Sequence, residues 1–527
     1  MSGKKAVVVV VLFLCVFVTG CIPGKTYRAK YPSEEVPPLP RFGGAEEQLP
    51  PGPLCNIKNA GDFKTPCMSY IELDDLGELR VAPGDLKLPD REQNAPTQLS
   101  VVLSLIRAAM KPVESERSQP IIMVFVHGWK HNAQNGNFED PNVQGQKDFL
   151  DLLKDRYPDE WIDAATWNRC KQGADGCVML RHPVVGIYIG WRGDTISHYF
   201  AVSRQFTYFD REATAYRVGG TSLTFVLSQI SALAHPAITP DNPHPKLDEP
   251  FLLMMGHSFG GLVLEKALQQ ALTERLDEGV SQKSTFADLI VLVNTAMAAS
   301  DSKQMIDLLA VREGRRGTLN PPESGSSKRY PMIVSLSSAT DQATLSAIFF
   351  GHGLTALKRN VTGGNRKPDP LFCYEPETQT TGIIRLFSQT DFYMHTAPHF
   401  EALQSHELKA FPQAQCKALE EMNPNLPASR LSDSFGPTES MDGTCYAVVP
   451  KNSKGGAQLG EAAGQRCNGT PYFVMEVPHE IIPDHGTIFT LRHWQLLTLF
   501  LNTTSENAGR PTQQQRGLIR LSGAQVR

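Results

Sequence analysis

A serine set among glycines is the feature of this sequence that points most directly to chemistry. The segment Gly256–Gly261 reads GHSFGG, follows the apolar run Phe251–Met255 and precedes a stretch with helical spacing. In that setting the serine lies on a sharp, strained turn, and its hydroxyl projects above the edge of a sheet. The glycines leave room for neighbouring backbone, and the N-terminus of the helix favours negative charge nearby. The pattern predicts that Ser258 is a nucleophile.

A nucleophilic serine needs a general base, and His485 is the best candidate. It lies in the loop between the apolar run Tyr472–Val477 and an amphipathic helical stretch at Ile488–Leu501. His479 is a rival because it is nearer to the strand. His493 falls inside the helical stretch, where we expect a packed surface group.

The base needs an acid that orients the imidazole and stabilises its protonated form. Asp341 follows the apolar run Met332–Leu336, and Asp301 follows Leu289–Val293, so both come after predicted strands. We expect Asp341 to be the acid and keep Asp301 as the alternative. The alternative at either position is an aspartate that only caps a helix or forms a turn.

The segment His127-Gly128-Trp129 directly follows the apolar run Ile121–Val126. Together with the GHSFGG turn and the late Asp484-His485-Gly486 loop, it resembles the α/β-hydrolase superfamily of serine esterases and lipases. The resemblance covers roughly residues 121–293 and the ends around Asp341 and His485. The long separation between those two ends departs from a minimal member of that family.

The resemblance implies the order serine, acid, histidine along the chain, which Ser258, Asp341 and His485 follow. It also implies an oxyanion hole made by two backbone N–H groups, here those of Trp129 and Phe259. His127 is then expected to be structural. The implied reaction is hydrolysis of carboxylic esters through an acyl-enzyme. Two alternatives stay open: acyl transfer to an envelope lipid or glycan, and a non-catalytic surface lipoprotein.

Short apolar runs alternate with helical stretches along the chain, which favours an α/β fold with a mostly parallel central sheet flanked by helices. The predicted strands are 121–126, 184–189, 251–255, 289–293, 332–336 and 472–477, and the predicted helices include 97–110, 221–233 and 261–276. Residues 70–81 alternate around a turn and suggest a hairpin. The hydrolase domain is expected over 55–502, with a polar tail at 503–527.

Two long insertions are expected, at about 130–182 and 342–470. The second is predicted to be a disulfide-containing subdomain, either a cap at the mouth of the active site or a remote decoration. Eight cysteines remain once Cys15 and Cys21 are set aside, and an even number in an exported chain indicates disulfides. Proximity suggests the pairs Cys55–Cys67, Cys170–Cys177, Cys373–Cys416 and Cys445–Cys467, with buried free thiols as the alternative.

The N-terminus predicts export and lipid anchoring. Lys4 and Lys5 precede an apolar run over residues 6–18, and Val18-Thr19-Gly20-Cys21 resembles a bacterial lipobox. We therefore expect a signal peptide at 1–20, lipidation of Cys21 and a proline-rich tether over 21–54. A plain signal peptide or a single anchor helix are the alternatives. Ile22, where an aspartate would favour the inner membrane, suggests the outer membrane of a bacterial envelope.

Composition adds exclusions. The formal net charge is −4 and no polybasic run occurs, which argues against a nucleic-acid partner. No metal-binding or phosphate-binding motif is present, so we expect neither a metal nor a cofactor. The expected partners are an acyl-ester substrate and, through Cys21, a membrane; the oligomeric state is left open.

Overall fold

The computed structural model of this chain describes fifteen parts of it. They are residues 27, 33–35, 63–79, 97–111, 116–134, 140–164, 170–193, 207–235, 249–277, 286–314, 333–344, 395–411, 429–430, 445–450 and 472–507. Cys21 and the predicted signal peptide lie outside these residues, as does nearly all of the predicted tether.

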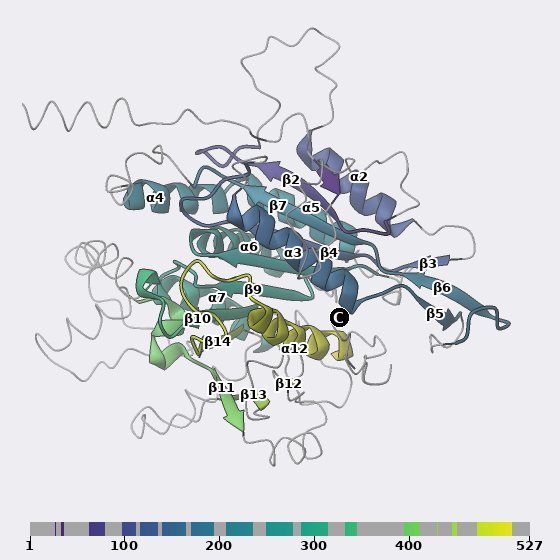
Figure 1. Cartoon of the computed structure of the whole chain (residues 1–527). Helices are drawn as coiled ribbons and strands as arrows, with labels where there is room; N and C mark the ends of the chain where they lie inside the picture. Colours follow the sequence, from purple (N-terminus) through teal and green to yellow (C-terminus); the bar gives the residue numbers. More distant parts are fainter. Residues whose placement is uncertain are drawn as a thin grey trace, which may run out of the picture.

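A mostly parallel sheet forms the centre of the molecule (Figure 1). Its strand order is β1-β2-β7-β4-β8-β9-β10-β14; β1 pairs antiparallel with β2, and every other neighbouring pair is parallel. The strands are β1 (Ser33–Glu35), β2 (Cys67–Glu72), β4 (Ile121–Val126), β7 (Val184–Gly190), β8 (Phe251–His257), β9 (Leu289–Val293), β10 (Ile333–Ser338) and β14 (Tyr472–Val477). The expected α/β architecture is confirmed.

Helices cover both faces of this sheet. They are α2 (Gln98–Met110), α3 (Pro141–Arg156), α4 (Tyr208–Gly219), α5 (Ser222–Ala234), α6 (Phe259–Asp277), α7 (Ala299–Gly314) and α12 (Leu491–Asn507). The central strands are buried on both sides, which explains their unbroken apolar runs. Along β4, Val124 faces the core under α2 and α4–α7, whereas Phe125 faces the core under α3 and α12.

The segment 70–81 differs from the predicted hairpin. β2 pairs in parallel with β7 inside the main sheet, and the turn after it is closed by an isolated antiparallel bridge between Leu73 and Leu79 and by the bond from the Asp74 N–H to the Glu78 carbonyl at 3.0 Å. Every residue of β2 is buried, because the strand packs between its neighbours rather than folding back on itself. In the turn after the strand, Asp74 Oδ1 accepts the N–H groups of Leu76 at 2.8 Å and Glu78 at 2.9 Å.

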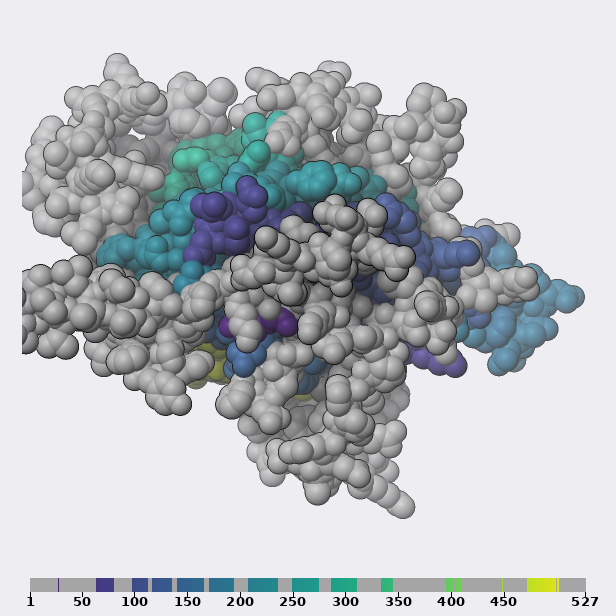
Figure 2. Space-filling model, turned by 90° about the horizontal axis from the view of Figure 1, so that it is seen from above, coloured from purple at the N-terminus to yellow at the C-terminus, as the bar shows by residue number. Residues whose placement is uncertain are grey.

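The expected insertion at 130–182 is smaller than predicted. Its first half contains α3, which buries Phe149 and Leu150 against the sheet and therefore belongs to the body of the domain. The second half, with β5 (Glu160–Asp163) and β6 (Cys177–Arg181), forms a separate three-stranded sheet with β3 (Glu116–Ser118). This small sheet extends from one side of the molecule (Figures 1 and 2).

The described parts of the 342–470 segment lie beside the edge strand β14. Two short 3₁₀ helices, η5 (Ala397–His399) and η6 (Glu401–Leu403), lead to a sheet of β11 (His406–Phe411), β13 (Cys445–Pro450) and β12 (Ser429–Arg430). Ser405 donates its N–H to the Val474 carbonyl, and Ser405 Oγ accepts the Val474 N–H, both at 3.0 Å. A cap over the active site stays a prediction.

The predicted disulfides and the predicted C-terminal tail are each confirmed only in part. The predicted pair Cys170–Cys177 is confirmed as a disulfide, and Cys67 is also disulfide-bonded. The other three predicted pairs each include a side chain outside the described residues. At the C-terminus, α12 continues to Asn507, beyond the start of the tail expected at 503. Within the described ranges, no helix has the length and apolar character to cross a bilayer.

Buried neutral histidines give the fold a pH dependence that can be tested at His493. Its Nδ1 lies 2.6 Å from the Ile488 carbonyl, and burial lowers its pKa from 6.5 to about 4. The pKa of His493 is lower in the folded state than in the unfolded state. The neutral ring therefore contributes fully to the free energy of unfolding above pH 6.5, and this contribution is lost as the pH falls toward 4. For one proton, the free energy of unfolding changes by about 1.4 kcal/mol per pH unit.

Asn at position 493 retains a hydrogen-bond donor but cannot titrate in this range. We predict that His493→Asn reduces the slope of unfolding free energy against pH between 6.5 and 4.5 by the amount that corresponds to about one proton. Guanidinium unfolding at a series of pH values measures it. Glu265, whose pKa burial raises to about 7, contributes the opposite slope equally in both proteins. Parallel pH profiles of wild type and variant would contradict the prediction.

Candidate active site

Ser258 occupies the tight turn between β8 and α6 that its flanking glycines predict. Its φ of 56° lies in the left-handed region, which few non-glycine residues adopt. The turn is possible only because Gly260 lacks a side chain, since a Cβ there would lie 2.1 Å from the Val126 carbonyl oxygen. The Ser258 N–H donates to the Val293 carbonyl at 3.0 Å, which ties the strained turn to β9.

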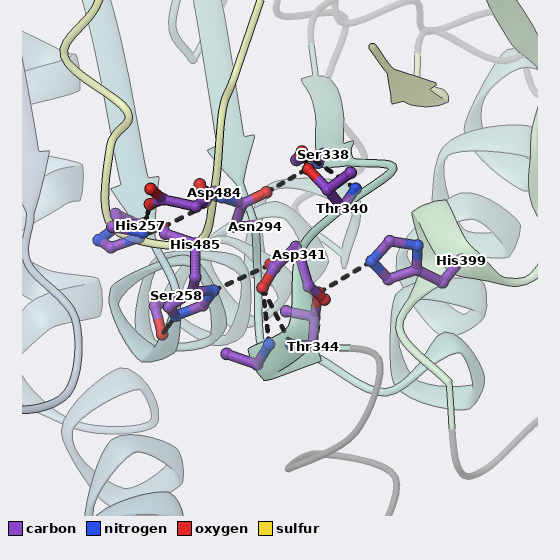
Figure 3. A network of polar contacts seen from close by, with 12 residues as sticks. His257, Ser258, Asn294, Ser338, Thr340, Asp341, Thr344, His399, Asp484 and His485 are labelled. Atoms are coloured by element: carbon purple, nitrogen blue, oxygen red, sulfur yellow. Dashed lines mark hydrogen bonds and ion pairs between the residues drawn. The ribbon is translucent and has the colours of Figure 1, made fainter. Parts of the chain in front are cut away.

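The side chains of Ser258, His485 and Asp341 meet at one edge of the sheet (Figure 3). His485 Nε2 lies 2.8 Å from Ser258 Oγ, and His485 Nδ1 lies 2.9 Å from Asp341 Oδ2. A carboxylate can only accept, so Nδ1 carries the proton of the neutral ring and Nε2 is left to accept from the serine. The arrangement can therefore take the serine proton while Asp341 holds the imidazole.

The structure separates the predicted residues from their rivals. His479 is largely exposed and pairs with Glu480 at 3.4 Å, and His493 is buried within α12. Asp301 lies in the first turn of α7 and accepts the Tyr216 hydroxyl at 2.6 Å. Among the described residues, His485 and Asp341 alone complete a chain of hydrogen bonds from Ser258.

Asp341 is fully buried, and its surroundings keep it ionised. Oδ1 accepts the N–H groups of Ala343 at 2.9 Å and Thr344 at 3.2 Å, while Oδ2 faces His485. Burial by itself raises the pKa of Asp341, but the hydrogen bond and charge of His485 and the bonds from Thr344 outweigh it, so the pKa lies below its usual value. Beyond the acid, Thr344 Oγ1 contacts His399 Nε2 at 2.8 Å.

The loop after β4 lies directly against Ser258. A Cβ on Gly128 would be 2.8 Å from Ser258 Cβ, so the two backbones approach as closely as glycine allows. Phe259 is the first residue of α6, and its N–H has no partner within the helix. Within the described residues, no acceptor is found for the main-chain N–H groups of Trp129 and Phe259.

A neutral histidine, His127, and a carboxylate, Asp140, hold this loop in place. His127 Nε2 accepts the Trp191 N–H at 3.0 Å, and burial lowers the pKa of His127 to about 4, in keeping with the structural role expected for it. Asp140, the N-cap of α3, contacts His131 Nδ1 at 2.9 Å and accepts the Asn132 N–H at 3.1 Å. These bonds tie the loop to Trp191 and to the N-terminus of α3.

Two residues at the site were not anticipated. His257 Nε2 lies 2.7 Å from the His485 carbonyl oxygen, and Asn294 Nδ2 lies 3.1 Å from the same oxygen. In the sequence, His257 occupies a variable position of the GHSFGG turn, which gives no sign of a specific role. Asn294 follows the apolar run of β9, and a polar residue at the carboxyl end of a buried strand is the signal that could have found it.

The remaining site predictions concern groups that the structure does not describe. Cys21, the predicted lipidation site, lies outside the described residues. Within the described part of the chain, no cluster of three or more histidine, cysteine or acidic side chains could hold a metal ion.

Comparisons with models of protein families, with curated proteins and with solved structures found no match to this chain. The case for a function therefore depends on the geometry around Ser258.

Proposed function

We propose that this protein is a serine hydrolase of carboxylic esters with an α/β-hydrolase fold. The observation that supports it best is the hydrogen-bonded series Ser258–His485–Asp341, at 2.8 and 2.9 Å, at the carboxyl ends of parallel strands. Serine, acid and histidine also follow β8, β10 and β14, in the order which that family uses. An unrelated buried polar cluster has no reason to include a serine in a left-handed turn.

In the proposed reaction, Ser258 Oγ attacks the ester carbonyl while its proton moves to His485 Nε2. The N–H groups of Trp129 and Phe259 hold the oxyanion, and α6, which begins at Phe259, adds the positive end of its dipole. His485 then gives the proton to the leaving alkoxide, and water releases the acyl group by the same steps. Asp341 stays ionised throughout and stabilises the imidazolium.

The anchoring of the chain is a separate proposal. We propose that lipidation of Cys21 holds the enzyme at a bacterial envelope, facing its periplasmic or surface side. The lipobox-like sequence supports it, and the Cys170–Cys177 disulfide is in keeping with an oxidising compartment.

The triad is tested with p-nitrophenyl esters of short and long acyl chains. Ser258→Ala should abolish hydrolysis of both. Asp341→Asn should lower kcat by about 10³- to 10⁴-fold with little change in KM, because the amide favours the wrong tautomer of His485. Thr340→Val, a neighbouring change outside the triad, serves as control. Ester hydrolysis by Ser258→Ala at the wild-type rate would rule the mechanism out.

The oxyanion loop is tested by Gly128→Ala. The added methyl would lie 2.8 Å from Ser258 Cβ and 3.0 Å from the His257 carbonyl oxygen, so the loop must move away from the nucleophile. We expect kcat/KM to fall by about 10²-fold, the usual effect of a displacement near 1 Å.

The matched control for that change is Gly486→Ala, beside His485. An added Cβ at Gly486 has its nearest neighbour, Asp484 Oδ1, at 3.8 Å, so we expect near wild-type kinetics. Circular dichroism checks that both variants are folded. Equal activity in the two glycine variants would contradict the placement of the oxyanion hole.

A further inference from the structure

Asn294 lies where three parts of the site meet. It is fully buried at the end of β9, with a φ of 46° in the left-handed region. Its Nδ2 donates to the carbonyl oxygens of Asp484 and His485, each at 3.1 Å, and its Oδ1 accepts the Ser338 N–H at 2.9 Å. One amide therefore joins the base loop to the end of β10 (Figure 3).

The main chain on either side of Asn294 holds the nucleophile. The Val293 carbonyl accepts the Ser258 N–H, and the Ala296 N–H donates to the Ser258 carbonyl, both at 3.0 Å. Ser338 in turn leads to the acid, because its carbonyl accepts the Asp341 N–H at 3.1 Å. Residues 293–296 thus bond directly to the nucleophile turn and base loop, and through Ser338 to the acid turn.

His257 gives the base loop a second donor. A carbonyl oxygen can only accept, so the 2.7 Å contact between His257 Nε2 and the His485 oxygen places the proton of the ring on Nε2. Burial first, and then the charges of His485 and His131, lower the pKa of His257, which keeps the ring neutral. Its Nδ1 has no hydrogen-bond partner within the described residues, so the His485 contact is the one polar bond that orients it.

We propose that Asn294 and His257 are positioning residues that fix the backbone of His485, so that its imidazole reaches Ser258 and Asp341 together. The proposal rests on the hydrolase function given above and adds the residues that hold its base in place. His485 follows the short strand β14 in a loop, and its side chain is 28% exposed. The buried side chains of Ile481, Ile482 and Ile488 anchor the ends of this loop, and the bonds to the His485 main chain fix the part between them.

The left-handed backbone at residue 294 allows the two contributions of Asn294 to be separated. Asparagine, aspartate and glycine all tolerate positive φ. Asn294→Gly keeps the backbone and removes the whole amide. Asn294→Asp keeps an acceptor for the Ser338 N–H but turns the donor toward His485 into a second acceptor, so the loop is repelled.

At position 257, glutamine and leucine form a matched pair. Gln Nε2 can donate from nearly the same point as His Nε2, whereas leucine has a similar volume and no donor. Thr340→Val is the external control, because it removes hydroxyl contacts with the Pro483 carbonyl of the same loop at 2.9 Å and with the Ser338 hydroxyl at 3.0 Å, while the Ser338 N–H bond to Asn294 and both donors to His485 stay in place.

The experiment measures kcat and KM for a p-nitrophenyl ester and the rate at which a fluorophosphonate labels Ser258, in wild type and all five variants. We expect Asn294→Asp and Asn294→Gly to lower kcat and the labelling rate by about 10²-fold, with KM within about threefold of wild type. His257→Leu should lower kcat and the labelling rate by about tenfold, and in His257→Gln both should be close to the wild-type values. Thr340→Val should match wild type.

The outcomes separate the two proposals. A wild-type protein that neither hydrolyses esters nor is labelled would overturn the hydrolase function and the positioning role with it. A reactive wild type with equally reactive Asn294 and His257 variants would overturn the positioning role alone. Losses in kcat that follow a lowered melting temperature in every variant, Thr340→Val included, would also overturn it, because they would reflect general loosening of the fold.

Discussion

The site depends on the parallel register of four strands. β8, β9, β10 and β14 are neighbours in the sheet and run in the same direction, so the residues that follow their carboxyl ends come to one edge. Ser258, Asn294, Asp341 and His485 are separated widely in the sequence, yet they follow these strands in turn. A change in the register of β14 would move His485 away from Ser258, which β8 and β9 hold in place.

Electrostatics then decide what this geometry can do. Asp341 is buried but receives two backbone N–H groups and His485, so it can be charged without facing water. His127 and His257 are buried without a carboxylate partner, and their lowered pKa values keep them neutral. His485 is thus paired with a carboxylate, while His127 and His257 serve as fixed hydrogen-bonding groups.

The features that short stretches of sequence determine, namely the buried strands and the turn at Ser258, could be predicted from the sequence. The apolar runs of β4, β9 and β14 coincide with the observed strands, because strands buried on both faces need apolar residues throughout. The glycines around Ser258 predicted its turn. The positions of Asp341 and His485 after predicted strands made them candidates, and the structure places His485 2.8 Å from Ser258 and Asp341 2.9 Å from His485.

The rest depends on contacts between distant segments. The turn residues after β2 predict a hairpin, whereas the pairing of β2 with β7 joins segments more than a hundred residues apart. The insertion expected at 130–182 includes α3, whose place in the domain body depends on the contacts of Phe149 and Leu150 with the distant strands of the sheet. Asn294 gave no motif, because its role arises from bonds to residues 338, 484 and 485.

The account is tested most directly by identifying the covalent intermediate. The protein is mixed with p-nitrophenyl acetate, quenched with acid within its first turnovers, digested and analysed by mass spectrometry. The account predicts one added acetyl group on the peptide that contains Ser258, formed in step with a burst of p-nitrophenol. Steady ester hydrolysis with no acetyl group on Ser258, or with the group on another residue, would contradict it.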